Sequence, residues 1–376
     1  MRFLSFLPAP AGTVLRYTVS LAVLGWLAGR VDWARFGGWH GLDLSLALPA
    51  ALLAGLAYPL QAWRWQLLLR AQGMMLPIGW VHRVFWIGQF CNSFLPGGVG
   101  GDALRFGHLW RIHPDRKTAA VASLIADRAL GLGTLFALAA MALGLHIAVA
   151  PGGAELQILF VASLATFSLL LVAGWSAIRS LWWEPLSVRL LGSERAASLR
   201  EAAGALGRHH ATLVTATALS IGVWLVDFIS LWLLARSAGL AAGLLDLTVA
   251  GAAAYVAAAL PISIGGHGVR EGSLVALLAL LGVGIGQSDR VALLAAAFWT
   301  VSVGWSLLGG AVWLMSTRST RPVRDWPKGR LLRAAPAGSA ADPRCHNPHL
   351  GPAQPKPPAH ESSYAPRADA KPDNTT

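Results

Sequence analysis

Two arginines stand directly behind glycine-rich breaks in apolar sequence, and each has the chemistry to bind an anion. Arg105 ends the stretch Leu95-Pro96-Gly97-Gly98-Val99-Gly100-Gly101-Asp102-Ala103-Leu104-Arg105. Arg270 ends the stretch Leu260-Pro261-Ile262-Ser263-Ile264-Gly265-Gly266-His267-Gly268-Val269-Arg270, and the offset between the two arginines, as between Leu95 and Leu260, is 165 residues. A guanidinium binds phosphate through two parallel hydrogen bonds. The repeated pattern therefore predicts a duplicated site for a phosphate group.

The prolines and glycines of the two stretches break the helices and let a ligand approach the backbone. The helix that restarts behind each break adds free N–H groups and a positive dipole end, which also favour an anion. The alternative is that each Arg only reaches towards the membrane surface, as basic residues at helix ends do. Because both arginines recur at one offset, we favour ligand binding. The residues expected to act as helix breaks or hinges are Pro96, Gly97, Gly98, Gly100, Gly101, Pro261, Gly265, Gly266 and Gly268.

Further polar residues accompany these arginines. Asp102 and Glu271 adjoin them and would neutralise them, or carry protons if transport is coupled to protons. Asp127 and Arg128 lie about ten residues into an apolar segment, where unpaired charge is costly, so we expect them to face the bundle interior. Asp227 also lies within an apolar segment. For such polar groups, hydrogen bonding between helices is an open alternative to ligand contact. The candidate substrate-binding residues are Arg105, Arg270, Asp102, Glu271, Asp127, Arg128 and Asn92.

The composition predicts an integral membrane protein. Of 376 residues, 55% are hydrophobic and only 13% charged, and the mean hydropathy of +0.54 is too high for a soluble domain of this length. The formal charge of +12 is explained by basic loops near lipid headgroups, so we expect no nucleic-acid partner. Two cysteines, Cys91 and Cys345, make no metal site, and no Walker loop or zincin motif is present. We therefore expect no metal, no cofactor and no catalytic residue.

Apolar segments long enough to cross a bilayer of about 30 Å can be assigned along the chain. Arg64, Arg70 and Arg83 follow the second of them, and the positive-inside rule then places the loop 64–83 and both termini in the cytoplasm. The predicted spans cover residues 11–28, 44–63, 118–148, 156–178, 211–235 and 291–315.

The basic loop 105–117 is also predicted to be cytoplasmic, so residues 84–105 must enter and leave the membrane on the same side. A re-entrant hairpin does this, and 247–286 is the second candidate. Three crossings separate the hairpins, so they enter from opposite faces, although two full spans in place of each hairpin are the alternative. We expect an all-α integral membrane protein with about six to eight transmembrane helices and two re-entrant, Pro/Gly-broken hairpins in an inverted-topology repeat.

The predicted domain organisation follows the composition. Residues 1–316 form a polytopic membrane domain with repeat halves at about 11–148 and 156–316. Residues 317–376 are rich in Arg, Pro and Ala and cannot build a core, so we expect a disordered, basic and Pro-rich cytoplasmic tail.

Three ordered motifs resemble one known family. They are Asn92-x-x-Leu95-Pro96-Gly97-Gly98-x-Gly100-Gly101-Asp102-x-x-Arg105, then Ser123-x-x-x-Asp127-Arg128-x-x-Gly131, then Leu260-Pro261-x-Ser263-x-Gly265-Gly266-x-Gly268-x-Arg270-Glu271. Together they are similar to the transmembrane domain of lysylphosphatidylglycerol synthases, which is also found in stand-alone flippase-like membrane proteins. The resemblance covers about residues 10–316. In the fused members of this family the domain is expected to move the aminoacylated lipid between leaflets. Other relatives are linked to hopanoid or polyprenyl-linked glycolipid pathways, so the resemblance implies a role in lipid transport or lipid synthesis.

The leading hypothesis is a flippase or transporter of the bacterial inner membrane that moves a phosphate-bearing glyco- or aminolipid. Its partners would be membrane lipids with anionic or phosphate headgroups, and a lipid-synthesis enzyme is a further partner to consider. The low-complexity residues after Met315 cannot be an aminoacyltransferase domain, so synthase activity is not expected. The alternatives are a membrane-embedded enzyme that modifies lipid phosphates, with His267 near its site, and a non-transporting membrane partner of a hopanoid or glycolipid pathway.

Overall fold

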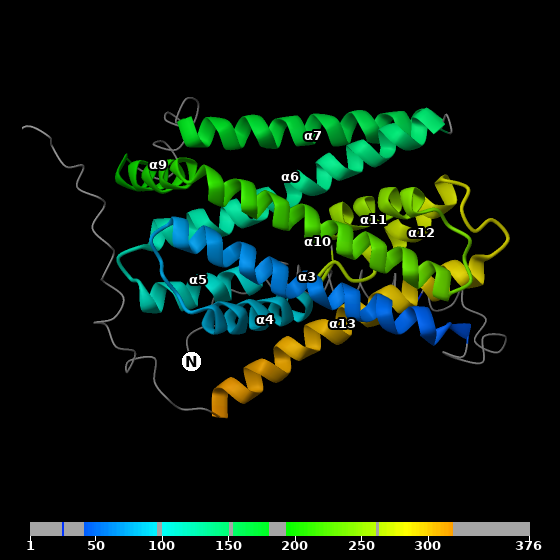
Figure 1. Ribbon diagram of the computed structural model, residues 1–376, viewed down its shortest axis with the longest axis horizontal. Helices are drawn as coiled ribbons and strands as arrows, with labels where there is room; N and C mark the ends of the chain where they lie inside the picture. The colour runs from blue at the N-terminus through cyan, green and yellow to red at the C-terminus, as the bar shows by residue number, and fades with distance from the viewer. Residues whose placement is uncertain are drawn as a thin grey trace, which may run out of the picture. The chain divides into compact units, whose positions relative to one another are not determined.

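The described part of the chain is entirely helical. The computed structural model describes Gly25 and residues 41–95, 100–149, 153–179, 193–260 and 263–318, and within these residues there are ten helices and no strand (Figure 1). The predicted all-α membrane class is therefore confirmed. The first predicted span, 11–28, lies outside the described residues, as does the predicted tail beyond residue 318.

Five helices are long and apolar enough to cross a membrane: α3 (Leu44–Ala71), α6 (Lys117–Val149), α7 (Ala154–Arg179), α10 (His210–Ser237) and α13 (Ser288–Arg318). They contain the five predicted spans that fall within the described residues. One prediction is wrong in detail. Helix α3 continues through Arg64 to Ala71, so Arg64 is part of a membrane helix and does not belong to a cytoplasmic loop.

Two pairs of shorter helices form the predicted hairpins. Helix α4 (Ile78–Phe94) packs against α5 (Gly100–Ile112), and α11 (Leu244–Ala259) packs against α12 (Val269–Leu280). With 13 and 12 residues, α5 and α12 reach about 20 Å and 18 Å, well short of the roughly 30 Å hydrocarbon core. Figure 1 shows each pair returning to the end of the bundle from which it came, α4 and α5 on the left and α11 and α12 on the right. The re-entrant arrangement holds in place of two full spans.

The order of elements repeats along the chain. A long helix, a broken pair and a long helix occur as α3–α4–α5–α6 and again as α10–α11–α12–α13. Three long helices, α6, α7 and α10, separate the two pairs, so the pairs enter from opposite ends (Figure 1). This is the inverted-topology repeat expected from the sequence. The connection also contains α9 (Ser193–Arg208), which packs on α6 and α7.

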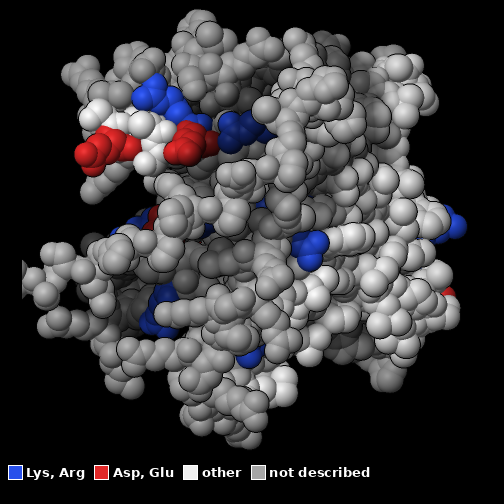
Figure 2. All heavy atoms as spheres, turned by 60° about the vertical axis from the view of Figure 1, so that its left-hand side comes forward, with Lys and Arg blue, Asp and Glu red and all other residues white. Residues whose placement is uncertain are grey.

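Exposed charges differ between the two ends of the bundle. The end where α4 begins and α5 finishes carries exposed basic residues, namely Arg70, Arg83, Arg111, Arg116 and Lys117. In Figure 2, where this end comes forward, most of the visible acidic side chains form one group beside basic ones, and other basic side chains stand apart from them. The opposite end carries the exposed residues Asp43, Glu155, Arg236 and Arg290 and the half-buried Asp246 and Asp289. The basic end is therefore the one that the positive-inside rule predicts to be cytoplasmic.

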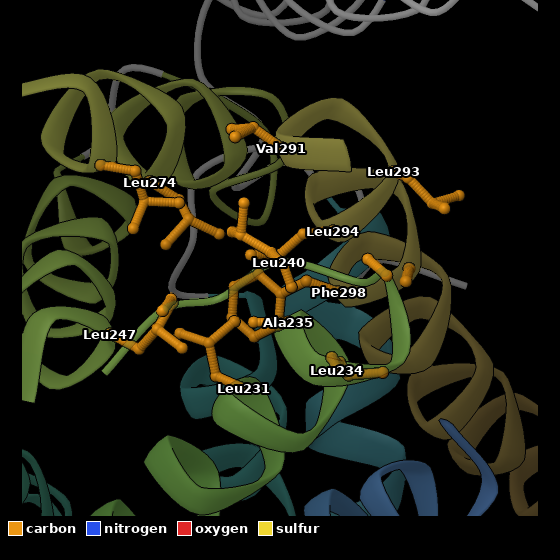
Figure 3. Packing of buried hydrophobic residues seen from close by; sticks show 14 of the residues in the cluster. Leu231, Leu234, Ala235, Leu240, Leu247, Leu274, Val291, Leu293, Leu294 and Phe298 are labelled. Carbon is orange, nitrogen blue, oxygen red and sulfur yellow. The ribbon is translucent and has the colours of Figure 1, made fainter. Parts of the chain in front are cut away.

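A hydrophobic cluster fixes the second hairpin to its neighbours. It joins α10, α11, α12 and α13 through buried side chains, and in Figure 3 Leu231, Leu247, Leu294 and Phe298 gather between these helices. Leu247 of α11, Leu274 of α12 and Leu294 of α13 are fully buried there. Since every partner helix contributes, the broken segment before α12 is anchored on both sides.

A corresponding cluster holds the first hairpin. Trp65 and Leu69 of α3, Phe85 of α4, Leu109 of α5 and Ala120 of α6 are buried in it. Trp65 and Phe85 are the largest of these side chains, and their rings lie beneath the guanidinium of Arg105. The core of this half thus forms the floor of the first candidate site.

Candidate functional site: two ion networks at the helix breaks

Close packing between α4 and α5 positions Arg105. A Cβ atom on Gly101 would collide with the carbonyl oxygen of Gly88, so the two helices can meet only because glycines face each other here. A Cβ on Gly88 would lie 2.9 Å from Arg105 Nε, so the Arg side chain occupies the space that this glycine leaves. Asn92 Oδ1 accepts a hydrogen bond of 2.8 Å from the backbone N–H of Gly101. The predicted binding residue Asn92 therefore joins the two limbs of the hairpin.

Arg105 is only 3% exposed and is held mainly by weak polar contacts. Its Nη2 donates to Gln89 Oε1 at 3.2 Å, and its Nη1 lies 3.4 Å from Asp102 Oδ1 and 3.9 Å from Asp127 Oδ2. The guanidinium carbon stands 4.1 Å from the ring centroid of Phe85. Its Nε is buried and has no hydrogen-bond partner among the described residues. Arg105 thus retains donor capacity for a further acceptor.

Asp127 is bound more tightly by an arginine that the sequence reasoning assigned to a loop. Arg64 Nε donates to Asp127 Oδ1 at 2.7 Å, and Arg64 Nη1 donates to Ser220 Oγ at 2.9 Å. Both charged side chains are 6% exposed. Gly131, in the second sequence motif, lies beside this guanidinium, and a Cβ on it would stand 3.4 Å from Arg64 Nη1, an ordinary contact distance. The uninterrupted helical sequence after Trp63 was the one available signal for Arg64.

The adjacent residue Arg128 pairs with the other carboxylate. Its Nε and Nη2 lie 2.8 Å and 2.7 Å from Asp102 Oδ2, and its side chain is 51% exposed. Asp127 and Arg128 therefore have different partners, as their positions about 100° apart on a helix allow. The first ion network contains three arginines (Arg64, Arg105, Arg128) and two aspartates (Asp102, Asp127), and so carries one excess positive charge.

The second network lies at the start of α12. Arg270 Nε and Nη2 contact Glu271 Oε1 at 2.8 Å and 2.5 Å, and Glu271 Oε2 accepts the backbone N–H of Gly268 at 2.7 Å. The guanidinium carbon of Arg270 stands 4.3 Å from the ring centroid of Phe298. Gly265, Gly266 and Gly268 have φ values of 60°, 77° and 82°, a region that L side chains rarely adopt. The glycines of this break are therefore required by the backbone itself.

Asp227 of α10 adds a second carboxylate to this network. The Tyr255 hydroxyl hydrogen-bonds to it, and the charge of Arg270 acts on it. The charges of Asp227 and Arg270 also act on the hydroxyl group of Tyr58, which belongs to α3. Among the described residues no Lys, Arg or His comes within ion-pair distance of Asp227. The second network thus has two carboxylates for one arginine.

The two breaks meet inside the bundle. A Cβ on Gly265 would lie 2.5 Å from the carbonyl oxygen of Ser93, and the rings of Phe94 and His267 are 6.3 Å apart. Ser93 Oγ also hydrogen-bonds to Ser306 Oγ of α13 at 2.8 Å. The predicted hinge residues Pro96, Gly97, Gly98 and Pro261 lie outside the described residues. The structure has two ion networks on either side of this contact, one around Arg105 and one around Arg270.

An apolar hollow of about 610 Å³ opens between α3, α4 and α13. Trp86 and Trp305 line it, and Trp305 Nε1 is already bound to the carbonyl oxygen of Ala51 at 2.8 Å. Its lining therefore offers few hydrogen-bonding groups to a polar headgroup. The remaining lining residues are Pro49, Leu52, Leu53, Gly55, Leu56 and Pro59.

The described residues contain no group of three His, Cys, Asp or Glu side chains placed to hold a metal ion. In a comparison with known protein families, the model described as lysylphosphatidylglycerol synthase TM region matches residues 13–314. The match includes both helix breaks and every residue of the two ion networks. No curated protein matches the chain.

Proposed function

Since the chain belongs to the lysylphosphatidylglycerol synthase transmembrane-region family, it is a multi-pass membrane protein related to lipid modification or translocation, and we propose that it is a lipid flippase. Its substrate would be a glyco- or aminolipid with a phosphate in the headgroup. The observation that carries the proposal is the first ion network, a group with one excess positive charge beside the point where two broken helices meet.

The network suits a phosphate in both charge and hydrogen bonding. A phosphodiester brings one negative charge, which balances the excess arginine and avoids an uncompensated charge at membrane depth. Arg105 Nε is buried without a hydrogen-bond partner among the described residues, so it has a hydrogen to donate to a phosphate oxygen. Arg128 can supply a second contact because half of its side chain is exposed. Arginine is well suited to this role because its planar donors match phosphate oxygens.

The helix breaks support movement of the headgroup between leaflets. In inverted-repeat transporters the substrate site lies at the interface of the repeats, formed by interrupted helices, and one repeat rocks against the other. Here the first break touches the second through Ser93 and Gly265. The phosphate would pass from the Arg105 network to the Arg270 network as access changes from one end of the bundle to the other.

The charge distribution supports an orientation in the bacterial inner membrane. Arg70, Arg83, Arg111, Arg116 and Lys117 gather at one end, which would face the cytoplasm. The basic residues after the last helix would then also be cytoplasmic, together with both termini. The first ion network would receive lipid from the cytoplasmic side and the second would release it outside, or the reverse.

A liposome assay tests the proposal. The purified full chain is placed in liposomes with fluorescent phosphatidylglycerol, and a membrane-impermeant quencher reports the fraction of probe in the outer leaflet. We expect the protein to speed exchange of this lipid between leaflets and to leave its mass unchanged. A fluorescent lipid without phosphate should exchange more slowly.

The two alternative functions give different results in the same experiment. An enzyme acting on lipid phosphates would return a probe of changed mass. A non-transporting partner of a synthesis pathway would leave both the distribution and the mass of the probe unchanged.

A further inference from the structure

One half-buried carboxylate, Asp227, has no arginine within ion-pair distance among the described residues. Asp227 lies on the long helix α10, and its described contacts are the hydroxyl of Tyr255 and the charge of Arg270. Arg270 is already bound by Glu271 through two of its nitrogens, at 2.8 Å and 2.5 Å. Among the described residues Arg270 is the one arginine whose charge acts on Asp227, and it is already paired with Glu271. An ionised carboxylate without a cation is costly at this depth.

The surroundings of Asp227 are hydroxyl and aromatic groups. Tyr58 approaches from α3, Tyr255 from α11 and Arg270 from α12. The ring of Trp224, one turn before Asp227 on α10, stands 5.0 Å from the ring of Tyr255. From α6, α9 and α13, no ionic side chain among the described residues forms an ion pair with Asp227. The hydroxyl of Tyr58 hydrogen-bonds to Ser306, whereas the hydroxyl of Tyr255 bonds to Asp227 and can do so with either the protonated or the ionised carboxyl group.

The charge of the second network depends on this one group. With Asp227 ionised, one arginine faces two carboxylates and the network repels an arriving phosphate. With Asp227 protonated, Arg270 and Glu271 balance each other and that repulsion is lost. The first network has the opposite balance, three arginines to two carboxylates, so a phosphate moving between them would otherwise meet an unfavourable field.

We propose that Asp227 is a proton-binding site that couples lipid movement to a proton gradient. The inference rests on the proposed flippase function. One proton adds to a carboxylate oxygen of Asp227 as the phosphate reaches Arg270, and the same O–H bond breaks when the phosphate leaves. No electron transfer and no further reactant is involved.

The first test detects the proton itself and needs no transport. Infrared difference spectra of the purified protein in lipid nanodiscs are recorded as pH is changed, in the parent and in Asp227→Asn. The parent should show a protonated-carboxyl C=O band that titrates, and Asp227→Asn should lack it. If both proteins give the same titrating bands, Asp227 binds no proton and the inference is wrong.

The second test measures coupling in the liposome assay with fluorescent phosphatidylglycerol and an imposed pH gradient. We expect the parent rate to change several-fold with the gradient, and the Asp227→Asn rate to be the same with and without it. Glu155→Gln, an exposed acid at the start of α7, is the matched control and should respond as the parent does. Tyr255→Phe keeps the carboxylate and removes its hydroxyl partner, so it should move the midpoint of the pH response without abolishing it.

The outcomes separate the inference from the function on which it rests. A parent protein that moves the lipid equally fast with and without the gradient is a flippase without proton coupling, and Asp227 then has another role. A parent protein that moves no lipid overturns the proposed function, and the coupling falls with it. If Asp227→Asn does not fold, the response of Tyr255→Phe decides, because an unchanged midpoint contradicts a proton on Asp227.

Discussion

Arg64 Nε lies 2.7 Å from Asp127 Oδ1, in an ion pair that joins α3 to α6 across 63 residues of sequence. Both side chains are 6% exposed, and Arg64 also donates to Ser220 on α10. The pair therefore holds three long helices together beside the first helix break. It also leaves Arg105 with only a long contact to the same carboxylate, 3.9 Å from Asp127 Oδ2.

Removing one member of this pair should destabilise the protein. Arg64→Ala leaves Asp127 buried with a single distant cation, and breaking a buried ion pair from one side costs about 3–5 kcal/mol. Unfolding by denaturant in detergent micelles measures the loss. The double variant Arg64→Met with Asp127→Leu should be more stable than Arg64→Ala, because it does not leave Asp127 buried without its close partner. Arg83→Ala, an exposed arginine on α4, should leave stability unchanged, and an equal loss in Arg83→Ala and Arg64→Ala would contradict the role of the pair.

The contact between the two breaks should not tolerate a side chain. Gly265→Ala adds a Cβ 2.5 Å from the carbonyl oxygen of Ser93, at a φ of 60°. The backbone strain alone destabilises the protein by about 1–3 kcal/mol. In addition, the collision with Ser93 pushes the two helix breaks apart. We expect lower thermal stability and slower lipid exchange.

Gly133→Ala is the matched control for that substitution. Gly133 lies inside α6, and a Cβ there would meet nothing within 4 Å. It should raise stability by about 0.5–1 kcal/mol through helix propensity. If both glycine variants behaved alike, close packing of the breaks would not matter for function.

The opposite directions of the hairpins can be checked by labelling from each side of the membrane. Single cysteines replace Arg111, at the C-terminal end of α5, or Gln287, between α12 and α13, in a protein without Cys91 and Cys345. An impermeant reagent should label the two positions from opposite faces. Labelling of both from one face would exclude the inverted repeat.

Arg128 should contribute to lipid affinity through its exposed guanidinium. A hydrogen bond to a charged group is worth about 1.5–3 kcal/mol, so Arg128→Ala should weaken binding of short-chain phosphatidylglycerol about 10- to 100-fold. Arg128→Lys keeps the charge but loses the planar pair of donors. Its affinity for the lipid should lie between those of the parent and Arg128→Ala. Titration of the purified protein with this lipid measures the affinity. Equal affinity in all three proteins would remove Arg128 from the site.

Much of the fold could be predicted because the bilayer constrains it. The length of the apolar segments predicted the five long helices. The basic loops before and after residues 84–105 indicated that this segment enters and leaves the membrane on the same side. The repeat offset of Arg105 and Arg270 identified both breaks. These signals are local or periodic, so a single sequence contains them.

The partners inside the bundle could not be predicted in the same way. Arg64 follows an apolar run, where an arginine usually marks the end of a span, and its partner Asp127 lies on a different helix. The pairing of Arg128 with Asp102 and of Asp227 with Tyr255 likewise depends on how helices pack. For the same reason the sequence did not show that Asp127 would lie near Arg105 or that Asp227 would lie near Arg270.

The central claim is that the two networks carry a lipid phosphate between leaflets. The most direct test compares the exchange of fluorescent phosphatidylglycerol in liposomes containing equal amounts of folded parent, Arg105→Ala, Arg270→Ala and the exposed-arginine control Arg83→Ala. The account predicts that Arg83→Ala exchanges lipid at the parent rate and that each of the other two is at least about ten-fold slower, the loss of one charge-assisted contact. Parent-like exchange by both Arg105→Ala and Arg270→Ala would contradict it.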